Sequence, residues 1–290
     1  MSEQSEGKNQ KLVLLAVLAH PDDETFGMGG TLAFYAARGV DVHLVCATRG
    51  EVGEMEEEYL RGFNSVGERR VAELHCAAEK LGLKAVHFLD YRDSGMPGTA
   101  DNTHPQALIV APMEKVSDEI FQFMKMLKPQ VILTFDPIGG YRHPDHIAIH
   151  NATVMAFQKA VNANQQGTIP AYLPQKLYFH TMPNLALKIM VRLMPLVGKD
   201  PRKFGKNADI DLASITEVSF PTHAVIQFRS VAELREKASA CHASQGGHKM
   251  ARGPFGLLRR LFGTRETFMR AYPEPDSKKK EYDLFECVVA

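Results

Sequence analysis

The feature that most constrains this chain is a series of short, continuous apolar runs that alternate with helix-like segments. The first run, LVLLAVLA at Leu12–Ala19, contains no polar residue and is typical of a strand buried on both faces. Alternation of such strands with helices predicts an α/β fold with a mostly parallel sheet and helices on its faces. Further strands are expected over Val40–Thr48, Ala85–Asp90 and Gln130–Asp136, and helices over Val66–Leu81, Leu108–Leu127 and from Asp145 toward Ala160.

The pattern is less regular beyond Gln165, which predicts an irregular α+β C-terminal portion. Residues 1–10 are polar and predict a disordered tail. We expect residues 11–290 to form one domain, with a core over 11–165 and a substrate-covering portion over 166–290. In this portion, strands are expected at Lys176–Thr181, Ile215–Phe220 and Tyr282–Val289, and a helix near Val231–His242.

Two apolar stretches with basic residues remain without an assignment, Leu185–Val197 and Gly253–Arg270. Each could be a basic amphipathic segment that touches a membrane, or a covering helix or subunit contact. The second reading is favoured because both stretches are short and the chain as a whole is neutral. If the chain forms a homo-oligomer, Leu185–Val197 is the expected contact.

Charge and cysteine content narrow the function class. The 34 Lys and Arg residues balance 34 Asp and Glu residues, which argues against a nucleic-acid partner and favours a small molecule. The four cysteines form no C-x-x-C pair, so we expect neither a disulfide framework nor a thiolate zinc site, and a reducing compartment. The eight apolar residues after the polar start are too few for a signal or spanning segment. These features predict a cytoplasmic enzyme without an integral membrane segment.

Acids and histidines follow four of the expected strands directly. Ligands bind at the carboxyl ends of parallel strands, so these side chains are expected to meet at one edge of the sheet. The four strand ends read HPDDE from His20, TRGE from Thr48, DYRD from Asp90 and DPIGGYRHPDH from Asp136.

Two of these strand ends predict a metal site. His20 and Asp23 lie three residues apart, and His143 and His146 repeat that spacing. Zinc takes about four ligands of these types at roughly 2.0–2.2 Å, and catalytic sites use three from the protein. We predict His20, Asp23 and His146 as ligands of Zn²⁺, with Fe²⁺ suited to the same set. Each residue alone could cap a helix or bind a carbonyl, but capping alone does not explain HPDDE and HPDH at two strand ends.

The residues beside this set have expected roles in catalysis. Asp22 is the candidate general base because it adjoins the ligand Asp23 and can take a proton from water. Protonated His143 could stabilise an oxyanion or protonate a leaving amine, and Tyr141 could donate its hydroxyl to the same oxyanion.

The chain resembles the PIG-L/LmbE-like family of metal-dependent de-N-acetylases, in motifs that run in order from residue 12 to about 245. The tracts that carry the resemblance are AHPDDE (Ala19–Glu24), TRGEVGE (Thr48–Glu54), R-x-x-E-L-x-x-A-A-x-x-L-G (Arg70–Gly82), FLDYRDSGM (Phe88–Met96), YRHPDH (Tyr141–His146) and K-A-x-x-x-H-x-S-Q (Lys237–Gln245).

This resemblance implies a Rossmann-like fold and zinc-dependent hydrolysis of an N-acyl bond on an N-acetylglucosamine conjugate. It implies the same metal ligands and the same base as the spacing does. The FLDYRDSGM tract is similar to the mycothiol branch of the family, and Arg70 and Asp93 match positions that contact sugar hydroxyls or phosphate. Each also has a purely structural interpretation: Arg70 could form an ion pair on a helix surface, and Asp93 could be a turn residue. Arg142 departs from the family, because many relatives have Gly there.

Four other functions are weighed against a deacetylase. An amidase acting on mycothiol S-conjugates would share every motif. A nucleotide-binding or glycosyl-transferring α/β protein is suggested faintly by GMGGT after the first strand, although G-x-G-x-x-G is absent. A metal phosphoesterase would usually need a second metal ion and more bridging carboxylates. An inactive binding module is disfavoured because every expected chemical group is present.

Overall fold

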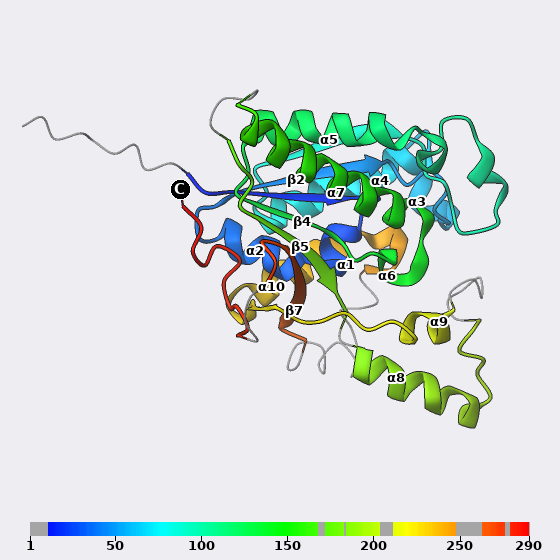
Figure 1. Cartoon of the computed structure of the whole chain (residues 1–290). Coiled ribbons are helices and arrows are strands. Elements are labelled where there is room, and N and C mark those ends of the chain that lie inside the picture. The colour runs from blue at the N-terminus through cyan, green and yellow to red at the C-terminus, as the bar shows by residue number, and fades with distance from the viewer. Residues whose placement is uncertain are drawn as a thin grey trace, which may run out of the picture.

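The computed structural model describes residues 11–167, 172–182, 184–203, 211–247, 263–275 and 279–289. Its centre is a seven-stranded sheet in the order β3-β2-β1-β4-β5-β7-β6 (Figure 1). Strands β1 to β5 run parallel, whereas β7 pairs antiparallel with both β5 and β6. The strands are β1 (Val13–Leu18), β2 (Asp41–Thr48), β3 (Ala85–Tyr91), β4 (Val131–Phe135), β5 (Lys176–Thr181), β6 (Ala224–Gln227) and β7 (Arg265–Tyr272).

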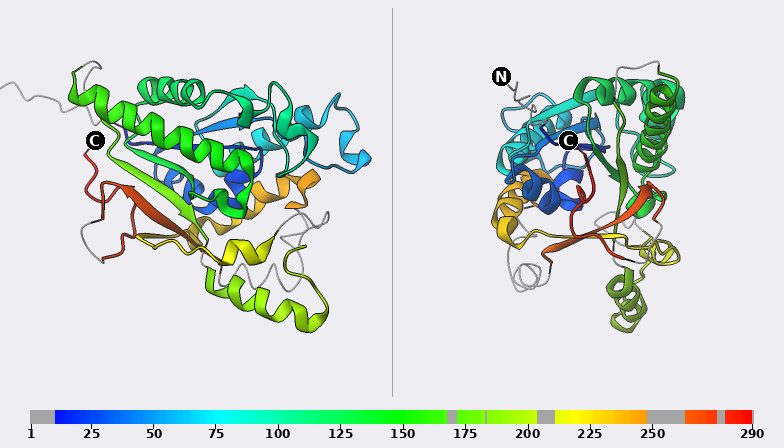
Figure 2. Two further views of the ribbon diagram at one scale, coloured as in Figure 1. Left: turned by 45° about the vertical axis from the view of Figure 1, so that its right-hand side comes forward. Right: turned by 60° about the vertical axis from the view of Figure 1, so that its left-hand side comes forward.

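Helices cover both faces of the sheet, as the α/β prediction requires. Helices α2, α4 and α10 pack together on one face, and α5 and α7 pack together on the other (Figure 2). Between them, residues Leu14–Leu18 of β1 are buried, with Leu14 in register with Val42 of β2 and Val131 of β4. The helices are α1 (Asp23–Gly27), α2 (Gly29–Ala36), α3 (Glu57–Leu60), α4 (Val66–Leu81), α5 (Met113–Leu127), α6 (Gly139–Arg142), α7 (Pro144–Gln165), α8 (Asn184–Leu193), α9 (Leu212–Thr216) and α10 (Ala232–Cys241).

The strand order reverses between β1 and β4, since the chain moves to β2 and β3 on one side and to β5 on the other. In doubly wound sheets this switch point leaves a crevice at the carboxyl ends of the two strands, where ligands bind. His20 follows β1 and the α6–α7 segment follows β4. The predicted metal ligands therefore start from the two strands that flank the switch point.

Local signals explain the boundaries of two helices, α4 and α5. At the start of α4, the Ser65 hydroxyl accepts a 3.1 Å hydrogen bond from the Glu68 amide, and Gly82 ends the helix in the left-handed region. Helix α5 begins at Met113 rather than at the predicted Leu108. Pro112 separates it from a 3₁₀ turn over Leu108–Val110, because proline cannot donate a helix-interior hydrogen bond.

Two predicted C-terminal strands are wrong. Ile215–Phe220 begins inside helix α9, where the Asp211 carboxylate caps the helix by accepting from the Ser214 amide at 3.0 Å. Tyr282–Val289 forms turns, and its Leu284 amide donates to the Tyr35 hydroxyl at 2.6 Å instead of to a strand. The sheet is completed by β6 and β7 instead.

The structure describes one of the two unassigned stretches in full and the other only in part. Leu185–Val197 lies in α8 and the following 3₁₀ turn, Met194–Val197. The end of Gly253–Arg270 enters β7, but residues 253–262 lie outside the described residues, as does the predicted tail over 1–10.

The expectation of no disulfide is also wrong. Cys76 of α4 and Cys241 of α10 are joined across a sequence separation of 165 residues. Spacing could not show this pairing because it depends on how the two helices pack. The cysteine argument for a reducing compartment loses its support, and the cytoplasmic location stays a prediction. None of the helices in the described ranges has the length and apolar character that a membrane crossing requires.

Candidate metal centre

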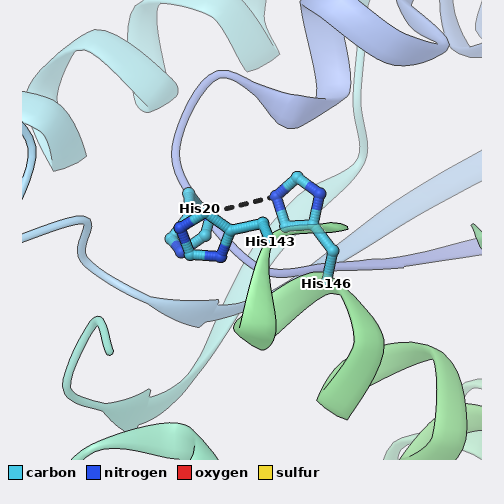
Figure 3. Close-up of side chains that lie close together, drawn as sticks. All are labelled: His20, His143 and His146. Carbon is cyan, nitrogen blue, oxygen red and sulfur yellow. Dashed lines mark hydrogen bonds between the residues drawn. The ribbon is translucent and has the colours of Figure 1, made fainter. Parts of the chain in front are cut away.

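Three predicted ligands converge at the switch point. His20 Nδ1 lies 3.2 Å from His146 Nε2 (Figure 3) and 3.6 Å from an Asp23 carboxylate oxygen. His146 Nε2 lies 3.2 Å from the other Asp23 oxygen. Ligand atoms at roughly 2.1 Å from a tetrahedral ion are separated by about 3.4 Å. The three distances match this spacing, so the residues fit a shared divalent cation.

The outer nitrogen of each ligand histidine has its own partner. His20 Nε2 lies 3.1 Å from an Asp145 carboxylate oxygen, and His146 Nδ1 lies 3.2 Å from the Gly139 carbonyl oxygen. Protons on these outer nitrogens leave His20 Nδ1 and His146 Nε2 with free lone pairs. The His20 amide also donates to Asp23 Oδ2 at 2.7 Å, which fixes that carboxylate. The donor set is therefore oriented toward one point.

The charges around this point favour a cation. Burial lowers the pKa of His20, but Asp93 and Asp145 outweigh it and raise the pKa well above its ordinary value. Burial raises the pKa of Asp23, but His146 and His20 outweigh it and hold that pKa well below its usual range. A cluster that stabilises both positive imidazole and negative carboxylate also suits a divalent ion.

Asp22 is kept apart from the ligand set by its backbone. Its φ of 124° lies in the left-handed region that non-glycine residues rarely adopt. Its carboxylate accepts from the Arg70 guanidinium at 3.1 Å rather than facing the histidine ligands. Burial raises the pKa of Asp22 to about 6, although Arg70 opposes this shift. The predicted base is thus a half-buried carboxylate beside the ligand set.

The two predicted substrate contacts are both buried. Arg70 donates to Asp22, to the Gly50 carbonyl at 3.0 Å and to the Pro21 carbonyl at 2.8 Å. A Cβ at Gly50 would collide with this guanidinium. Asp93 accepts from the Gly95 amide at 2.8 Å and lies 3.5 Å from His20 Nε2. Arg70 is therefore buried and does not form the ion pair on a helix surface that was the alternative interpretation.

His143 and Tyr141 stand beside the ligands. The Asp145 amide donates to His143 Nδ1 at 3.2 Å, which caps α7. Burial lowers the pKa of His143 to about 2, and the neighbouring His20 and His146 add to the shift. Because Nδ1 accepts the hydrogen bond from Asp145, a neutral His143 would carry its proton on Nε2. The protonated form expected from the sequence stays a prediction. The Tyr141 ring centroid lies 5.0 Å from that of His146.

Arg142 has a positive φ and a hydrogen-bond partner on α9. Its φ is 67°, in the region where glycine is favoured, so the Gly of many relatives fits this backbone without strain. In this chain the guanidinium donates to the Ser214 carbonyl of α9 at 3.2 Å. This hydrogen bond ties the Tyr141 loop to α9.

Three site residues were not assigned from the sequence. Asp145 orients His20, and Glu24 accepts from the Asp22 amide at 3.0 Å while its other oxygen lies 2.6 Å from His242 Nε2. Asp145 belongs to HPDH and Glu24 to AHPDDE, and His242 belongs to the K-A-x-x-x-H-x-S-Q tract. All three residues lie in motifs that the sequence displays. The motifs do not show that Glu24 pairs with His242, which is 218 positions away.

Two cavities border the ligand set. A polar cavity of about 590 Å³ and an apolar one of about 340 Å³ share Tyr141 as a wall residue. The polar cavity is lined by His20, Asp22, Glu54, Arg70, Asp93 and His143, and the apolar one by Asp23, Phe26, Phe135, His146, Met182 and Phe228. The ligand set therefore separates a polar subsite from an apolar one.

The glycine run after β1 does not form a phosphate loop. The Glu266 carboxylate of β7 accepts from the Gly30 and Thr31 amides at 3.0 and 2.7 Å. A negative side chain already occupies this end of α2, where a phosphate would bind. Gly30 is instead required by close packing, because a Cβ there would collide with the Phe228 ring. The nucleotide-binding alternative loses its support.

Fold and site define a class of protein: an α/β chain whose switch point presents a buried His-Asp-His set that could hold a divalent metal ion. Residues 15–157 match the model of the PIG-L family, which is described as "GlcNAc-PI de-N-acetylase". A 1D-myo-inositol 2-acetamido-2-deoxy-alpha-D-glucopyranoside deacetylase from Rhodococcus jostii is 36% identical over 241 residues, which cover 80% of this chain and 81% of that protein. The chain belongs to the PIG-L family of de-N-acetylases and is an enzyme that hydrolyses amide bonds.

Two further comparisons agree. A deacetylase of the same name from Acidothermus cellulolyticus is 34% identical over 289 residues, which cover 94% of each chain. Among solved structures, N,N'-diacetylchitobiose deacetylase from Pyrococcus horikoshii matches 90% of this chain and 84% of its own, with a TM-score of 0.60 at 20% identity. The second match shows a shared fold, which confirms the predicted architecture.

Proposed function

We propose that this enzyme removes the acetyl group from N-acetylglucosamine linked to inositol, releasing acetate and the free amine. The observation that carries the proposal is the Asp22 carboxylate, held beside the converging atoms of His20, Asp23 and His146 and lining a polar cavity. The names and close identity of the two curated deacetylases support the choice of substrate.

The ion that the site would hold is Zn²⁺, with Fe²⁺ as the alternative that suits the same ligands. His20 through Nδ1, His146 through Nε2 and the Asp23 carboxylate would bind it. When bound, such an ion polarises an amide carbonyl and makes water more acidic.

Asp22 is assigned as the general base. It takes a proton from the attacking water and later gives a proton to the departing glucosamine nitrogen, so that water is divided between acetate and amine. Arg70 holds the Asp22 carboxylate and is assigned to this positioning rather than to the predicted sugar contact, because its bonds go to Asp22 and two backbone carbonyls.

His143 and Tyr141 are assigned to the carbonyl oxygen. His143 donates through Nε2–H, because Nδ1 already accepts from the Asp145 amide. Burial raises the pKa of the Tyr141 hydroxyl, which keeps it protonated and able to donate. Both groups stabilise negative charge that develops on the oxygen in the transition state.

The polar cavity is assigned to the sugar and inositol. Asp93 is buried at its wall beside His20 and can accept from a sugar hydroxyl. Charged and polar walls suit a ligand with many hydroxyl groups, because each hydroxyl needs a partner when it leaves water.

A second candidate is an amidase of the mycothiol S-conjugate type. The apolar cavity of about 340 Å³ favours it, because this space lies beside the ligands Asp23 and His146 and is larger than an acetyl methyl needs. Phe26, Phe135 and Phe228 in its walls would bury an apolar acyl group.

The two candidates are separated by a comparison of substrates. The zinc-loaded enzyme is incubated with N-acetylglucosaminyl-inositol, with N,N'-diacetylchitobiose and with an S-alkylated cysteinyl-glucosaminyl-inositol, and the new primary amine is measured. The proposal expects the highest kcat/KM with N-acetylglucosaminyl-inositol. A higher value with the cysteinyl conjugate selects the amidase, and hydrolysis of none of the three rejects both.

A further inference from the structure

Helix α8 stands off the main body of the molecule in all three views of the chain (Figures 1 and 2). Its inner face packs on α9 and closes a small core separate from the one around the sheet. This small core consists of Leu187, Val191, Met194, Leu212 and Ile215, and Tyr141 packs against it. The helix is therefore anchored on one side, next to a wall residue of both cavities.

The opposite face of α8 is also apolar. Ile189, Leu193 and Leu196 are 53%, 52% and 80% exposed, and Met190 beside them is exposed as well. Ile189 and Leu193 lie one turn apart on α8, and Leu196 follows in the 3₁₀ turn Met194–Val197. An isolated exposed leucine needs no explanation, but a continuous apolar face on a projecting helix indicates an interaction site.

Basic residues lie in the same segment as this apolar face. The segment 188–203 carries five cations and a single acid, Asp200, although the whole chain is neutral. We name as the α8 surface the apolar residues Ile189, Met190, Leu193 and Leu196 together with the cations Lys188, Arg192, Lys199, Arg202 and Lys203.

We propose that the α8 surface docks this enzyme on an anionic membrane surface. Apolar side chains with adjacent lysine and arginine residues are the pattern of helices that lie in the plane of the lipid interface. The apolar residues would enter the boundary between headgroups and acyl chains, while the cations contact anionic headgroups. The chain would be bound to the surface and not cross it.

A second copy of this chain is a poorer occupant of the α8 surface. A two-fold contact places the same patch of each copy against the other. The five cations of one α8 surface would then face the five of its partner, and like charges brought together oppose association. The exposed side chains of the α8 surface therefore favour a membrane over the subunit contact expected from the sequence.

The position of α8 gives docking a consequence for the active site. Its inner face packs on the same small core as Tyr141, which borders both cavities. A docked enzyme would hold the active site close to the bilayer. The inference does not depend on which amide substrate the enzyme hydrolyses.

The test uses the full-length chain and vesicle sedimentation. Vesicles of phosphatidylcholine alone are compared with vesicles of equal parts phosphatidylcholine and phosphatidylglycerol. The chain is expected to bind the anionic vesicles, to bind neutral ones far more weakly, and to dissociate as salt is raised. Leu193→Asp with Leu196→Asp, and separately Arg192→Glu with Lys199→Glu, should each weaken binding about tenfold or more.

Met126→Asp is the matched control, because Met126 is an exposed apolar residue on α5, across the sheet from α8. It should bind anionic vesicles as the wild type does, and circular dichroism checks that every variant is folded. The proposal is overturned if the wild type does not bind anionic vesicles, binds neutral ones equally well, or loses nothing in both double variants. It is also overturned if the wild type is a dimer that Leu193→Asp with Leu196→Asp converts to monomers.

Discussion

Glu24 shows how much a single side chain contributes to this site without touching a ligand. It is fully buried, and its two carboxylate oxygens join the Asp22 amide to the His242 ring. Asp22 has a strained backbone, and such conformations persist only when neighbours hold them. Glu24 is therefore a positioning residue for the base.

Glu24→Ala tests this role. The Asp22 amide and the His242 ring each lose a buried partner, so the free energy of unfolding should fall by about 2 kcal/mol. Deacetylation should lose kcat with little change in KM, because the base moves but the polar cavity stays. Glu24→Gln is the control, since its amide oxygen still accepts from the Asp22 amide and should restore most of kcat. An equal loss of kcat in both variants contradicts the positioning role.

The sequence predicted that the candidate metal ligands would meet, but it did not predict which groups Arg70 contacts. His20, Asp23 and His146 could be predicted because short spacings at strand ends fix where their side chains meet. The partners of Arg70 are Asp22, Pro21 and Gly50, which lie 20 to 49 residues away. Such contacts follow from the packing of α4 on the strand ends, which spacing alone does not describe.

At the scale of elements, the parallel part of the sheet was predictable and the antiparallel part was not. Strands β1 and β4 are buried almost throughout, and β1 and most of β4 read as apolar runs, whereas β2 and β3 include polar residues. Strand β7 contains three charged residues, because Glu266 caps α2 and its other charges lie near the surface. The sequence of such a strand shows neither a continuous apolar run nor a regular alternation of apolar and polar residues.

The disulfide between α4 and α10 is predicted to stabilise the polar cavity. Ser244, just beyond α10, donates to Glu73 of α4 at 2.7 Å and lines that cavity. Changing Cys76 and Cys241 to Ser should lower the free energy of unfolding by about 3 kcal/mol, because a long loop is no longer closed in the unfolded chain. KM should rise as the cavity wall loosens. Urea unfolding with and without a reductant checks this: the reductant should destabilise the wild type and leave the double variant unchanged.

An equal response of both proteins to the reductant would show that the two cysteines do not form the tether.

At the scale of the whole molecule, Glu281 ties the C-terminal segment to the sheet. Its carboxylate accepts from Lys176 at 2.7 Å and Tyr178 at 2.6 Å on β5, and from Arg270 on β7 at 2.8 Å. Burial raises the pKa of Glu281, but the hydrogen bonds and charges of Lys176 and its other partners outweigh it and lower that pKa. This cluster fastens the antiparallel edge to the parallel core.

The cluster makes stability depend on pH. The pKa of Glu281 is lower in the folded chain than the value of about 4.3 in an unfolded one. Its contribution is therefore complete above that unfolded value and is lost as pH falls through the folded pKa. Glu281→Gln should lower the free energy of unfolding by about 2 kcal/mol at pH 7, and the difference should shrink in acid. Urea unfolding at a series of pH values measures this, with exposed Glu57→Gln as the neutral control. If the difference in the free energy of unfolding between wild type and Glu281→Gln grows in acid, the assigned role of Glu281 is contradicted.

The central claim is metal-dependent amide hydrolysis with Asp22 as the base. Bound zinc and the rate of acetate release from N-acetylglucosaminyl-inositol are measured on the same preparations of wild type, Asp22→Asn and His146→Ala. His146→Ala should lose zinc. Asp22→Asn should keep zinc and lose activity by about 10³-fold, the usual scale of a missing general base. Acetate release by Asp22→Asn at the wild-type rate would contradict the account.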